Sequence, residues 1–228
     1  MEHTDREYCL EVWGDMACFT RPELKVERVS YDVITPSAAR AIFEAILFKK
    51  YAMWWQVSKI EVLNEIKWTS VRRNEVGATA SKSSIYIEDK RKRQQRNTLM
   101  LRDVRYRLWA KMMFVPVSER PEEAFAKHKP GNDENPMKYY EMFERRARQG
   151  QCFTQPYLGT RECTASFRLV DPLSETLTPP IPEDRDLGIM LYDLDFSKPK
   201  SVQAMFYHPV MNQGEISVPP INSKEILR

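Results

Sequence analysis

The sequence has few of the residues that usually hold metal ions. Its 228 residues include four cysteines and three histidines. The cysteines are Cys9, Cys18, Cys152 and Cys163, and the histidines are His3, His128 and His208. No two cysteines have the C-x-x-C spacing of a zinc site, and the histidines lie far apart along the chain. We therefore expect reduced, structural thiols, with neither a metal site nor a cofactor.

Long apolar segments are absent as well. No run approaches the roughly 20 apolar residues that a membrane-spanning helix needs. The N-terminal sequence M-E-H-T-D-R-E also lacks the charged-then-apolar pattern of a signal peptide. These absences lead us to expect a cytoplasmic protein that makes no contact with a membrane.

Apolar residues make up 42% of the chain and charged residues 29%, which is typical of a globular protein. A chain of this length can fold as one elaborated domain or as two small ones. The net charge of +3 is too small to indicate nucleic-acid binding by itself. The basic residues are clustered, however, and their distribution says more than the total. The clusters are Arg72 with Arg73, the run from Lys90 to Arg96, and Arg145, Arg146 and Arg148.

Two segments have the spacing of amphipathic helices. Thr35 can cap a helix that begins at Pro36, where apolar residues recur every three or four positions as far as Leu47. In the second segment, Asn135 can cap a helix that begins at Pro136, and Gly150 can take the left-handed conformation that ends it. Both helices are therefore well bounded.

Other segments alternate apolar and polar residues and predict strands. They are Glu7 to Gly14, Met53 to Leu63, Ile66 to Val71, Val104 to Phe114 and Thr164 to Val170, with shorter ones at Ile189 to Phe196, Val202 to Tyr207 and Glu215 to Val218. The range 104–114 has the clearest alternation, with one apolar face and one basic and aromatic face. Residues 73–98 are mostly polar, small or basic and predict a flexible insertion or a hairpin arm.

The order strand, helix, strand, strand, helix, strand is that of a ferredoxin-like or RNA-recognition-motif domain, an antiparallel sheet with two helices on one face. We expect an α+β fold in which this domain spans residues 1–171. The proline-rich stretch Pro172 to Pro182 would then lead into a small C-terminal antiparallel β-sheet domain, residues 172–228. The free face of such a sheet can bind RNA.

The start of the second helix has the features of an anion site. Lys138, Tyr139 and Tyr140 fall in its first turn, where unpaired N–H groups and the helix dipole favour a phosphate. An ammonium and phenols beside that end suit an RNA backbone. The alternative for Tyr139 and Tyr140 is packing against the sheet, since aromatic residues at helical spacing are more often core.

Several long motifs occur in one order: Y-C-L-E-V-W-G-D-M-A-C-F-T-R-P-E from Tyr8, K-V-E-R-V-S-Y-D-V-I-T-P-S-A-A-R-A-I-F-E-A-I from Lys25, V-R-R-N-E-V from Val71, the N-P-M-K-Y-Y segment from Asn135, and D-R-D-L-G-I-M-L-Y-D-L-D-F from Asp184 to Phe196. Together they resemble the CRISPR-associated Cas-five family, most closely its d subtype of system I-C. The resemblance covers nearly the whole chain.

This resemblance implies an endoribonuclease that cuts the repeat hairpin of pre-crRNA without a metal ion. The RNA's own 2′-hydroxyl attacks the adjacent phosphate and leaves a 2′,3′-cyclic phosphate. It also implies that the protein keeps the 5′ handle of the product and joins other subunits of a type I-C interference complex. The basic arm would in addition permit binding of duplex DNA.

The family's site consists of a tyrosine near the end of the first helix and a Lys-His pair that opens the second. Lys138 occupies the lysine position, whereas Tyr139 replaces the histidine and Leu47 the tyrosine. Leucine cannot move a proton. We expect Lys138 to lower the pKa of Tyr139 and favour its phenolate, and Tyr51 to supply a second hydroxyl. His128 could fold over the site from the preceding loop or have no task there.

The basic residues predicted to bind RNA are Arg72, Arg73, Lys49, Lys90, Arg91, Arg93 and Arg96. Charge runs are usually solvated faces, but phosphate binding needs such side chains on a projecting element. Phe153, Gln155 and Tyr157 could stack on RNA or line its path, or they could equally cap the sheet.

Two alternatives to the nuclease remain. One is a catalytically silent subunit that only binds the 5′ handle of the crRNA. The other is an unrelated RNA-recognition-motif protein, although the aromatic signature of that motif is absent from the sequence.

Overall fold

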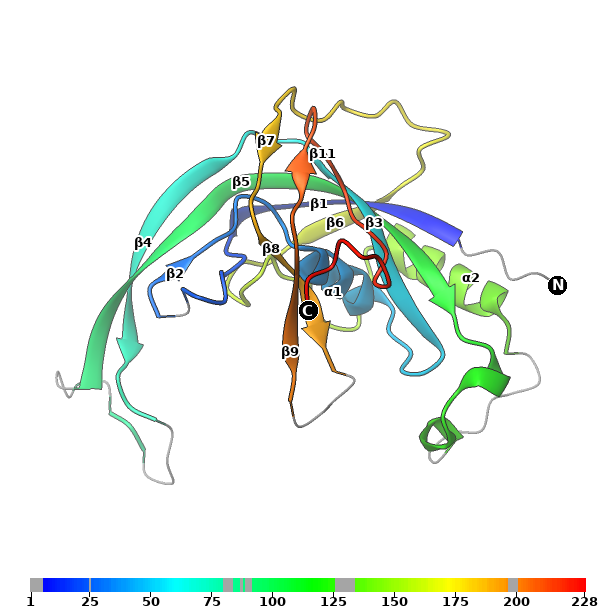
Figure 1. Ribbon diagram of the computed structural model, residues 1–228, viewed down its shortest axis with the longest axis horizontal. Helices are drawn as coiled ribbons and strands as arrows, with labels where there is room; N and C mark the ends of the chain where they lie inside the picture. Colours follow the sequence, from blue (N-terminus) through cyan, green and yellow to red (C-terminus); the bar gives the residue numbers. More distant parts are fainter. Residues whose placement is uncertain are drawn as a thin grey trace.

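The computed structural model describes residues 6–24, 26–79, 84–86, 88, 92–125, 134–196 and 201–228. Within them the fold is α+β, and seven strands form one mostly antiparallel sheet (Figure 1). These strands are β1 (Arg6–Ala17), β2 (Arg28–Val29), β3 (Met53–Val62), β4 (Lys67–Val76), β5 (Arg93–Phe114), β6 (Ser166–Val170) and β11 (Glu215–Ser217). The main order is β11-β3-β5-β1-β6, with β2 and β4 also paired to β5. None of the described helices is long and apolar enough to cross a membrane.

Strand β5 is 22 residues long and connects the parts of the sheet. Its C-terminal half pairs with β1 and β3, and its N-terminal half pairs with β4 and, in parallel, with β2. The predicted strand at 104–114 is confirmed and continues backwards into a hairpin with β4, so the prediction of a hairpin arm is also confirmed. The arm projects from one end of the arched sheet (Figure 1). Asp103, at φ +53°, marks the position where β5 bends.

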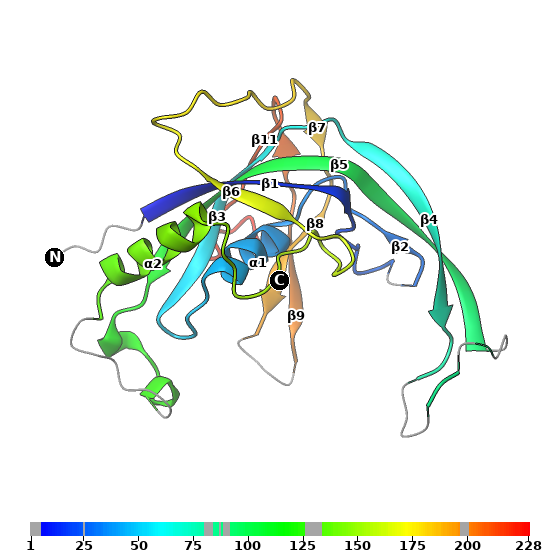
Figure 2. The same cartoon turned by 180° about the vertical axis from the view of Figure 1, so that it is seen from behind.

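Both helices lie on the concave side of the sheet (Figures 1 and 2). They are α1 (Pro36–Ile46) and α2 (Pro136–Arg148). As predicted, the Thr35 hydroxyl accepts a hydrogen bond from the Ala38 N–H at 3.3 Å, and Asn135 Oδ1 accepts one from the Lys138 N–H at 3.1 Å. Gly150 has φ +64° directly beyond the end of α2. The capping residues therefore fix where each helix starts and stops.

The core between the sheet and the helices is rich in aromatic rings. Phe143 of α2 is fully buried, and its ring centroid lies 4.6 Å from that of Trp55 and 4.7 Å from that of Tyr8. Phe43 of α1 packs against Trp55 at 4.9 Å. Because β1, β3 and both helices each contribute a ring, this cluster holds the helices to the sheet.

The C-terminal segment is divided between the large sheet and smaller ones. Strands β8 (Met190–Asp195) and β9 (Gln203–Tyr207) form a two-stranded antiparallel sheet, and β7 (Arg185–Asp186) pairs with β10 (Val210–Met211). The strand predicted at Glu215 to Val218 exists as β11, but it pairs with β3 of the large sheet instead of with its C-terminal neighbours. The reason is that Ile216, opposite Ile60, is fully buried there, and β3 would otherwise expose an unpaired edge.

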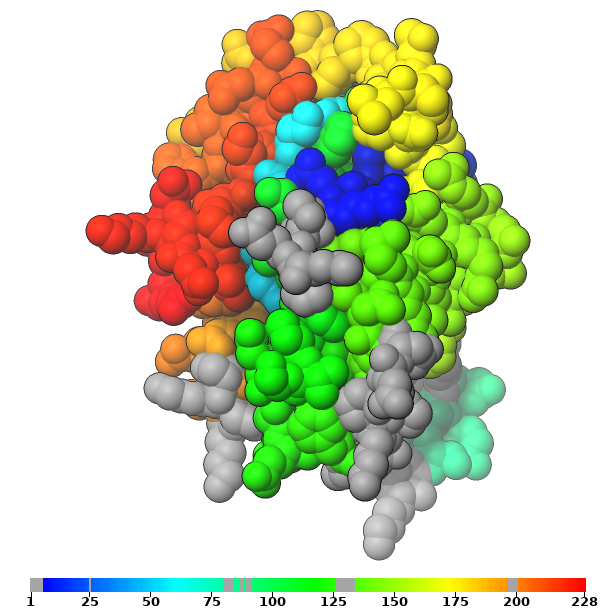
Figure 3. Space-filling model, turned by 90° about the vertical axis from the view of Figure 1, so that its right-hand side faces the viewer, coloured from blue at the N-terminus to red at the C-terminus, as the bar shows by residue number. Residues whose placement is uncertain are grey.

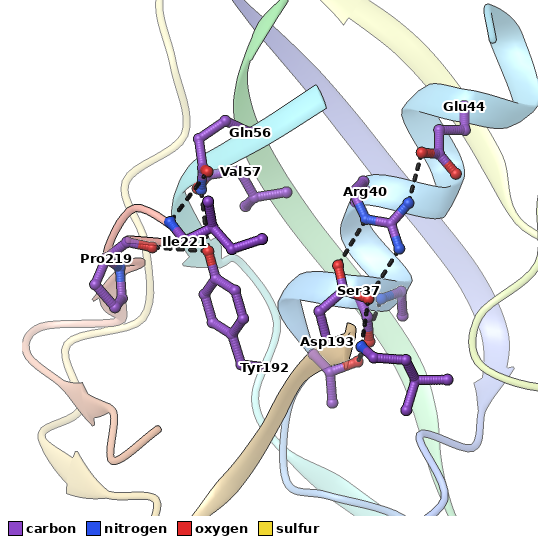
Figure 4. A network of polar contacts seen from close by, with 12 residues as sticks. Ser37, Arg40, Glu44, Gln56, Val57, Tyr192, Asp193, Pro219 and Ile221 are labelled. Carbon is purple, nitrogen blue, oxygen red and sulfur yellow. Dashed lines mark hydrogen bonds and ion pairs between the residues drawn. The ribbon is translucent and has the colours of Figure 1, made fainter. Parts of the chain in front are cut away.

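Polar contacts attach this C-terminal segment to α1 and β3 (Figure 4). The Arg40 guanidinium of α1 donates to both carboxylate oxygens of Asp193 on β8, at 2.8 and 2.9 Å, and to Glu44 at 2.5 Å. The Tyr192 hydroxyl donates to the Pro219 carbonyl at 2.9 Å and accepts from Gln56 of β3 at 3.2 Å. The two-stranded sheet is thus fixed beside α1.

Replacing Phe143 by alanine should lower the free energy of unfolding by about 3–5 kcal/mol, because it empties the centre of the aromatic cluster. Phe153→Ala is the matched control: this ring is 81% exposed, and its loss should cost less than about 0.5 kcal/mol. Denaturant unfolding of the two variants measures the difference. Equal stabilities would contradict the assignment of Phe143 to the core.

Candidate functional site

Three segments that are distant in sequence meet where β5 ends. The Val115 N–H donates to the Ala52 carbonyl at 3.0 Å, which joins the end of β5 to the loop after α1. The Val115 carbonyl in turn accepts two hydrogen bonds from the Arg120 guanidinium, at 3.0 and 2.8 Å. Arg120 follows the short 3₁₀ turn η2 (Val117–Glu119) and precedes a second one, η3 (Glu122–Phe125). Figure 3 looks onto this end, where the green end of β5 lies beside the yellow-green α2.

An ion pair connects this end of β5 to the start of α2. Arg120 Nη1 lies 2.5 Å from Glu134 Oε1, and the same oxygen accepts a hydrogen bond from the Tyr139 hydroxyl at 2.5 Å. The side chains of Arg120 and Glu134 are only 5% and 10% exposed. Phe114, whose ring lies 5.9 Å from that of Tyr139, closes the group. The first turn of α2 is therefore held in a defined place.

Tyr139 is buried, and its phenol is held in the neutral form. Burial raises the pKa of Tyr139 well above its usual value, and the hydrogen bond to the Glu134 carboxylate raises it further. The expectation that Lys138 would favour the Tyr139 phenolate is not met, because burial and the hydrogen bond to the Glu134 carboxylate both raise the pKa of Tyr139. Burial by itself would raise the pKa of Glu134, but the hydrogen bonds from Tyr139 and Arg120 outweigh burial and lower it.

The other expected site residues divide between core and surface. Leu47 is fully buried at the end of α1, and its carbonyl accepts a hydrogen bond from the Trp55 indole at 3.0 Å. Tyr51 lies in the loop that follows, with the left-handed value φ +67°, which is rare for a bulky residue. Lys50 lies over its ring, 4.6 Å from the centroid. The hydrogen bond with Tyr51 raises the pKa of Lys50.

Lys138 is exposed in the first turn of α2, and its charge helps to lower the pKa of Glu134. Lys49 is exposed in the same loop as Tyr51, and its carbonyl accepts the Ala52 N–H at 3.0 Å. The structure thus brings Lys49, Tyr51, Lys138 and Tyr139 to one end of the molecule. We call these four residues, with Lys50, the loop–helix site. Within the described part of the chain, no group of three or more His, Cys, Asp or Glu side chains is placed to hold a metal ion.

The remaining predicted RNA-binding residues that the structure describes lie on the arm, at the opposite end of β5 (Figure 1). Arg72 and Arg73 are on β4, and Arg93 and Arg96 are on β5, where Arg96 is directly opposite Arg73. Arg73 is held by two carboxylates, Glu162 at 2.8 Å and Glu75 at 2.7 Å, and Arg72 is more exposed. Lys90, Arg91 and His128 lie outside the described residues.

Sequence reasoning missed Arg120 and Glu134. Both are charged residues in a loop rich in charge, and no motif distinguishes them from their neighbours. The one signal is position, since Glu134 directly precedes the Asn135 cap, where a carboxylate interacts favourably with the helix dipole.

Replacing Glu134 by glutamine should lower the free energy of unfolding at pH 7 by about 2 kcal/mol, between the values for exposed and for buried ion pairs. The folded pKa of Glu134 is lowered, so its stabilisation is complete above the unfolded pKa of about 4.3 and is lost as the pH falls through the folded value. The difference in the free energy of unfolding between wild type and variant should therefore shrink as the pH is lowered from about 5 to about 2.

Denaturant unfolding across this pH range provides the measurement, with Glu141→Gln, an exposed position on the same helix, as control. A loss of unfolding free energy that does not depend on pH, or one that is equally large for Glu141→Gln, would argue against the ion pair.

Comparisons with known proteins agree over nearly the whole chain. Residues 7–219 match the Cas5d family, described as CRISPR-associated protein (Cas_Cas5). Two relatives are named CRISPR pre-crRNA endoribonuclease Cas5d. The one from Mannheimia succiniciproducens is 45% identical, over 96% of this chain and 97% of its own. The one from Thermus thermophilus is 37% identical, over 96% of this chain and 94% of its own.

Solved structures share the fold. One described as a CRISPR-associated protein has a TM-score of 0.69 at 23% identity and covers 98% of this chain and 97% of its own. A chain described as part of a CRISPR RNA-guided surveillance complex has a TM-score of 0.53 at 13% identity, covering 94% and 90%. The family resemblance of the sequence is thus confirmed: this protein belongs to the Cas5d family of CRISPR-associated proteins.

Proposed function

We propose that this protein is a pre-crRNA endoribonuclease that cuts the repeat hairpin. The observation that carries the proposal is the 45% identity, over 96% of the chain, to a relative of that name. The loop–helix site supports it, because it gathers an exposed ammonium, Lys138, and an accessible phenol, Tyr51, at one end of the molecule. No metal ion is needed for the reaction that we propose.

In this reaction the 2′-hydroxyl of the RNA loses its proton to a solvent water molecule, and the 2′-oxygen bonds to the adjacent phosphorus. The bond from phosphorus to the 5′-oxygen breaks, and a 2′,3′-cyclic phosphate remains. Lys138 and the first-turn N–H groups of α2 stabilise the negative charge that develops on the phosphate. Tyr51 donates a proton to the leaving 5′-oxygen.

We assign Tyr139 a positioning role. Its buried phenol donates to Glu134, so it fixes the first turn of α2 and with it Lys138, its neighbour in sequence. A neutral phenol whose pKa is raised is a poor base, which is why proton abstraction is not assigned to it.

We also infer that the product stays bound through its 5′ handle and that the chain assembles with other subunits of a type I-C interference complex. The basic arm, with Arg72, Arg93 and Arg96, supports contacts to the phosphates of RNA and is also suited to duplex DNA. A second candidate, a handle-binding subunit that does not cut, is favoured by one observation: Leu47 is buried where the family has a catalytic tyrosine.

For the fold, we propose a ferredoxin-like unit over residues 1–171. The elements β1, α1, β3, β5, α2 and β6 follow one another along the chain, and the strands lie in the antiparallel order β3-β5-β1-β6. This arrangement supports the proposal. Residues 172–228 would form the smaller C-terminal domain, which lends β11 to the edge of the large sheet.

Replacing Lys138 by alanine should slow cleavage of cognate repeat RNA by about 100- to 1,000-fold, because it removes a charge that stabilises the transition state. Single-turnover cleavage of 5′-labelled RNA in chelator measures the rate, and RNA with a 2′-deoxy sugar at the cut site should stay intact. Lys111→Ala is the control. That lysine is exposed on the face of β5 that points away from the buried core, so its loss should not change the rate of cleavage.

Cleavage that requires a divalent ion, or that proceeds on the 2′-deoxy RNA, would exclude the proposed reaction. Tight binding without any cleavage by the wild type would establish the handle-binding alternative.

Tyr51→Phe should lower the single-turnover rate by about 100-fold or more, because a proton donor is lost while the ring remains. Tyr139→Phe should change the rate less than about tenfold and act mainly on stability, through one hydrogen bond to a charged group. The same cleavage assay and thermal unfolding compare the two variants. If Tyr139→Phe has the larger effect on the rate, the two roles are assigned wrongly.

A further inference from the structure

A pocket of about 640 Å³ opens beside α1. One wall is α1, another is the segment Phe153–Gly159, and β8 supplies a third. Three aromatic rings at its edge are well exposed: Phe48 at 52%, Phe153 at 81% and Tyr157 at 41%. The volume lies within the roughly 300–1,000 Å³ typical of small-molecule pockets. Two roles were open for Phe153 and Tyr157, to stack on or line a path for RNA or to cap the sheet, and in the structure both line this pocket.

The walls are preformed by backbone hydrogen bonds. The carbonyl of Ala45, one of the last in α1, accepts from the N–H groups of Phe153 at 2.7 Å and Thr154 at 3.3 Å. The next carbonyl, of Ile46, accepts from the Arg146 guanidinium at 3.0 Å. The last carbonyls of a helix have no partners within the helix. Here the Phe153 segment and Arg146 supply the missing hydrogen-bond donors, which holds this segment against the end of α1. The Phe153 ring is exposed although its backbone N–H is hydrogen-bonded to the end of α1.

Small residues make the bottom of the pocket shallow and flat. Ala38, Ala41 and Ala45 follow one another along α1 at spacings of three and four and line it. Gly159, at φ +85°, closes the other side; a Cβ there would lie 2.0 Å from the Cys18 carbonyl oxygen. Apart from Glu44, the side chains that α1 contributes to the pocket within its helical span are small. A planar ring can lie against them.

The charge on the described pocket lining is neutralised by an ion pair. Glu44 is the acidic side chain among the described lining residues, and it is paired with Arg40 at 2.5 Å (Figure 4). Phe48 is followed directly by Lys49 and Lys50, and the basic arm lies at the other end of the arch. A single strand of RNA combines a chain of phosphates with planar bases. Its phosphates can contact the cations at the two ends of the arch, and its bases can contact the aromatic rings between those ends.

We propose that the pocket bounded by Phe48, Phe153 and Tyr157 receives an unstacked nucleobase of the bound RNA, an inference that rests on the proposed function. The base stacks on the exposed rings, and Thr154 and Gln155 offer polar groups to its edge. This subsite is separate from the cleavage chemistry of Lys138 and Tyr51. It binds the single-stranded part of the RNA.

The test is binding of cognate repeat RNA in which 2-aminopurine replaces each unpaired base in turn. Stacking quenches this base, so one position should lose fluorescence with the wild-type protein. Phe153→Ala should abolish the quenching and weaken binding at least about fivefold, as expected for loss of a stacking ring. Trp13→Ala, an exposed ring that alternates with the core-facing residues of β1, is the control and should leave both unchanged.

Phe48→Ala and Tyr157→Ala should repeat the effect of Phe153→Ala, and cleavage rates at saturating RNA should stay within about threefold of wild type. Wild-type affinity and quenching in all three variants would overturn the subsite and leave the nuclease proposal standing; the pocket would then serve another ligand, such as a protein segment. A wild-type protein that binds no repeat RNA would overturn both.

Discussion

The arrangement of this protein depends on the pairing of β5 along both of its halves. One 22-residue strand is hydrogen-bonded to β1 and β3 in one half and to β4 and β2 in the other. Its first half is the basic arm, and its last residues contact the loop after α1 through Val115. Since a paired strand cannot bend freely, the two basic ends of the arch stay a fixed distance apart. That is a constraint on where two stretches of one RNA can bind.

At the end of β5, a buried ion pair fixes the position of α2 relative to the sheet. Arg120 and Glu134 connect β5 to α2, and Tyr139 completes the connection. A histidine at position 139 could exchange protons near neutral pH, whereas the tyrosine present here cannot do so easily. In the proposed reaction Tyr139 therefore has a structural role, and the chemistry is assigned to Lys138 and to the loop that holds Tyr51.

Much of the fold could be predicted from the sequence because its signals are local. The caps Thr35 and Asn135 fixed both helix starts, and alternation found the strand at 104–114. Pairing partners are not local, which is why β11 was assigned to the wrong sheet. For the site, the exposed position of Lys138 could be predicted because it lies in the first turn of a capped helix. The surroundings of the Tyr139 side chain could not be predicted in this way. Its partner Glu134 comes from outside the helix, and no spacing rule could predict that this carboxylate accepts a hydrogen bond from the phenol.

The loop after α1 joins the two functions proposed for the concave face. Phe48 at the aromatic pocket and Tyr51 at the loop–helix site are three residues apart. The Lys49 carbonyl accepts hydrogen bonds from the N–H groups of Ala52 in this loop and of Met53, the first residue of β3. A left-handed tyrosine costs about 1–3 kcal/mol, which the surrounding contacts must offset. The strain is reasonable if the same short loop has to direct one ring toward a base and one hydroxyl toward a phosphate. A relaxed loop would move both groups together, so base binding and cleavage are expected to share one geometric requirement.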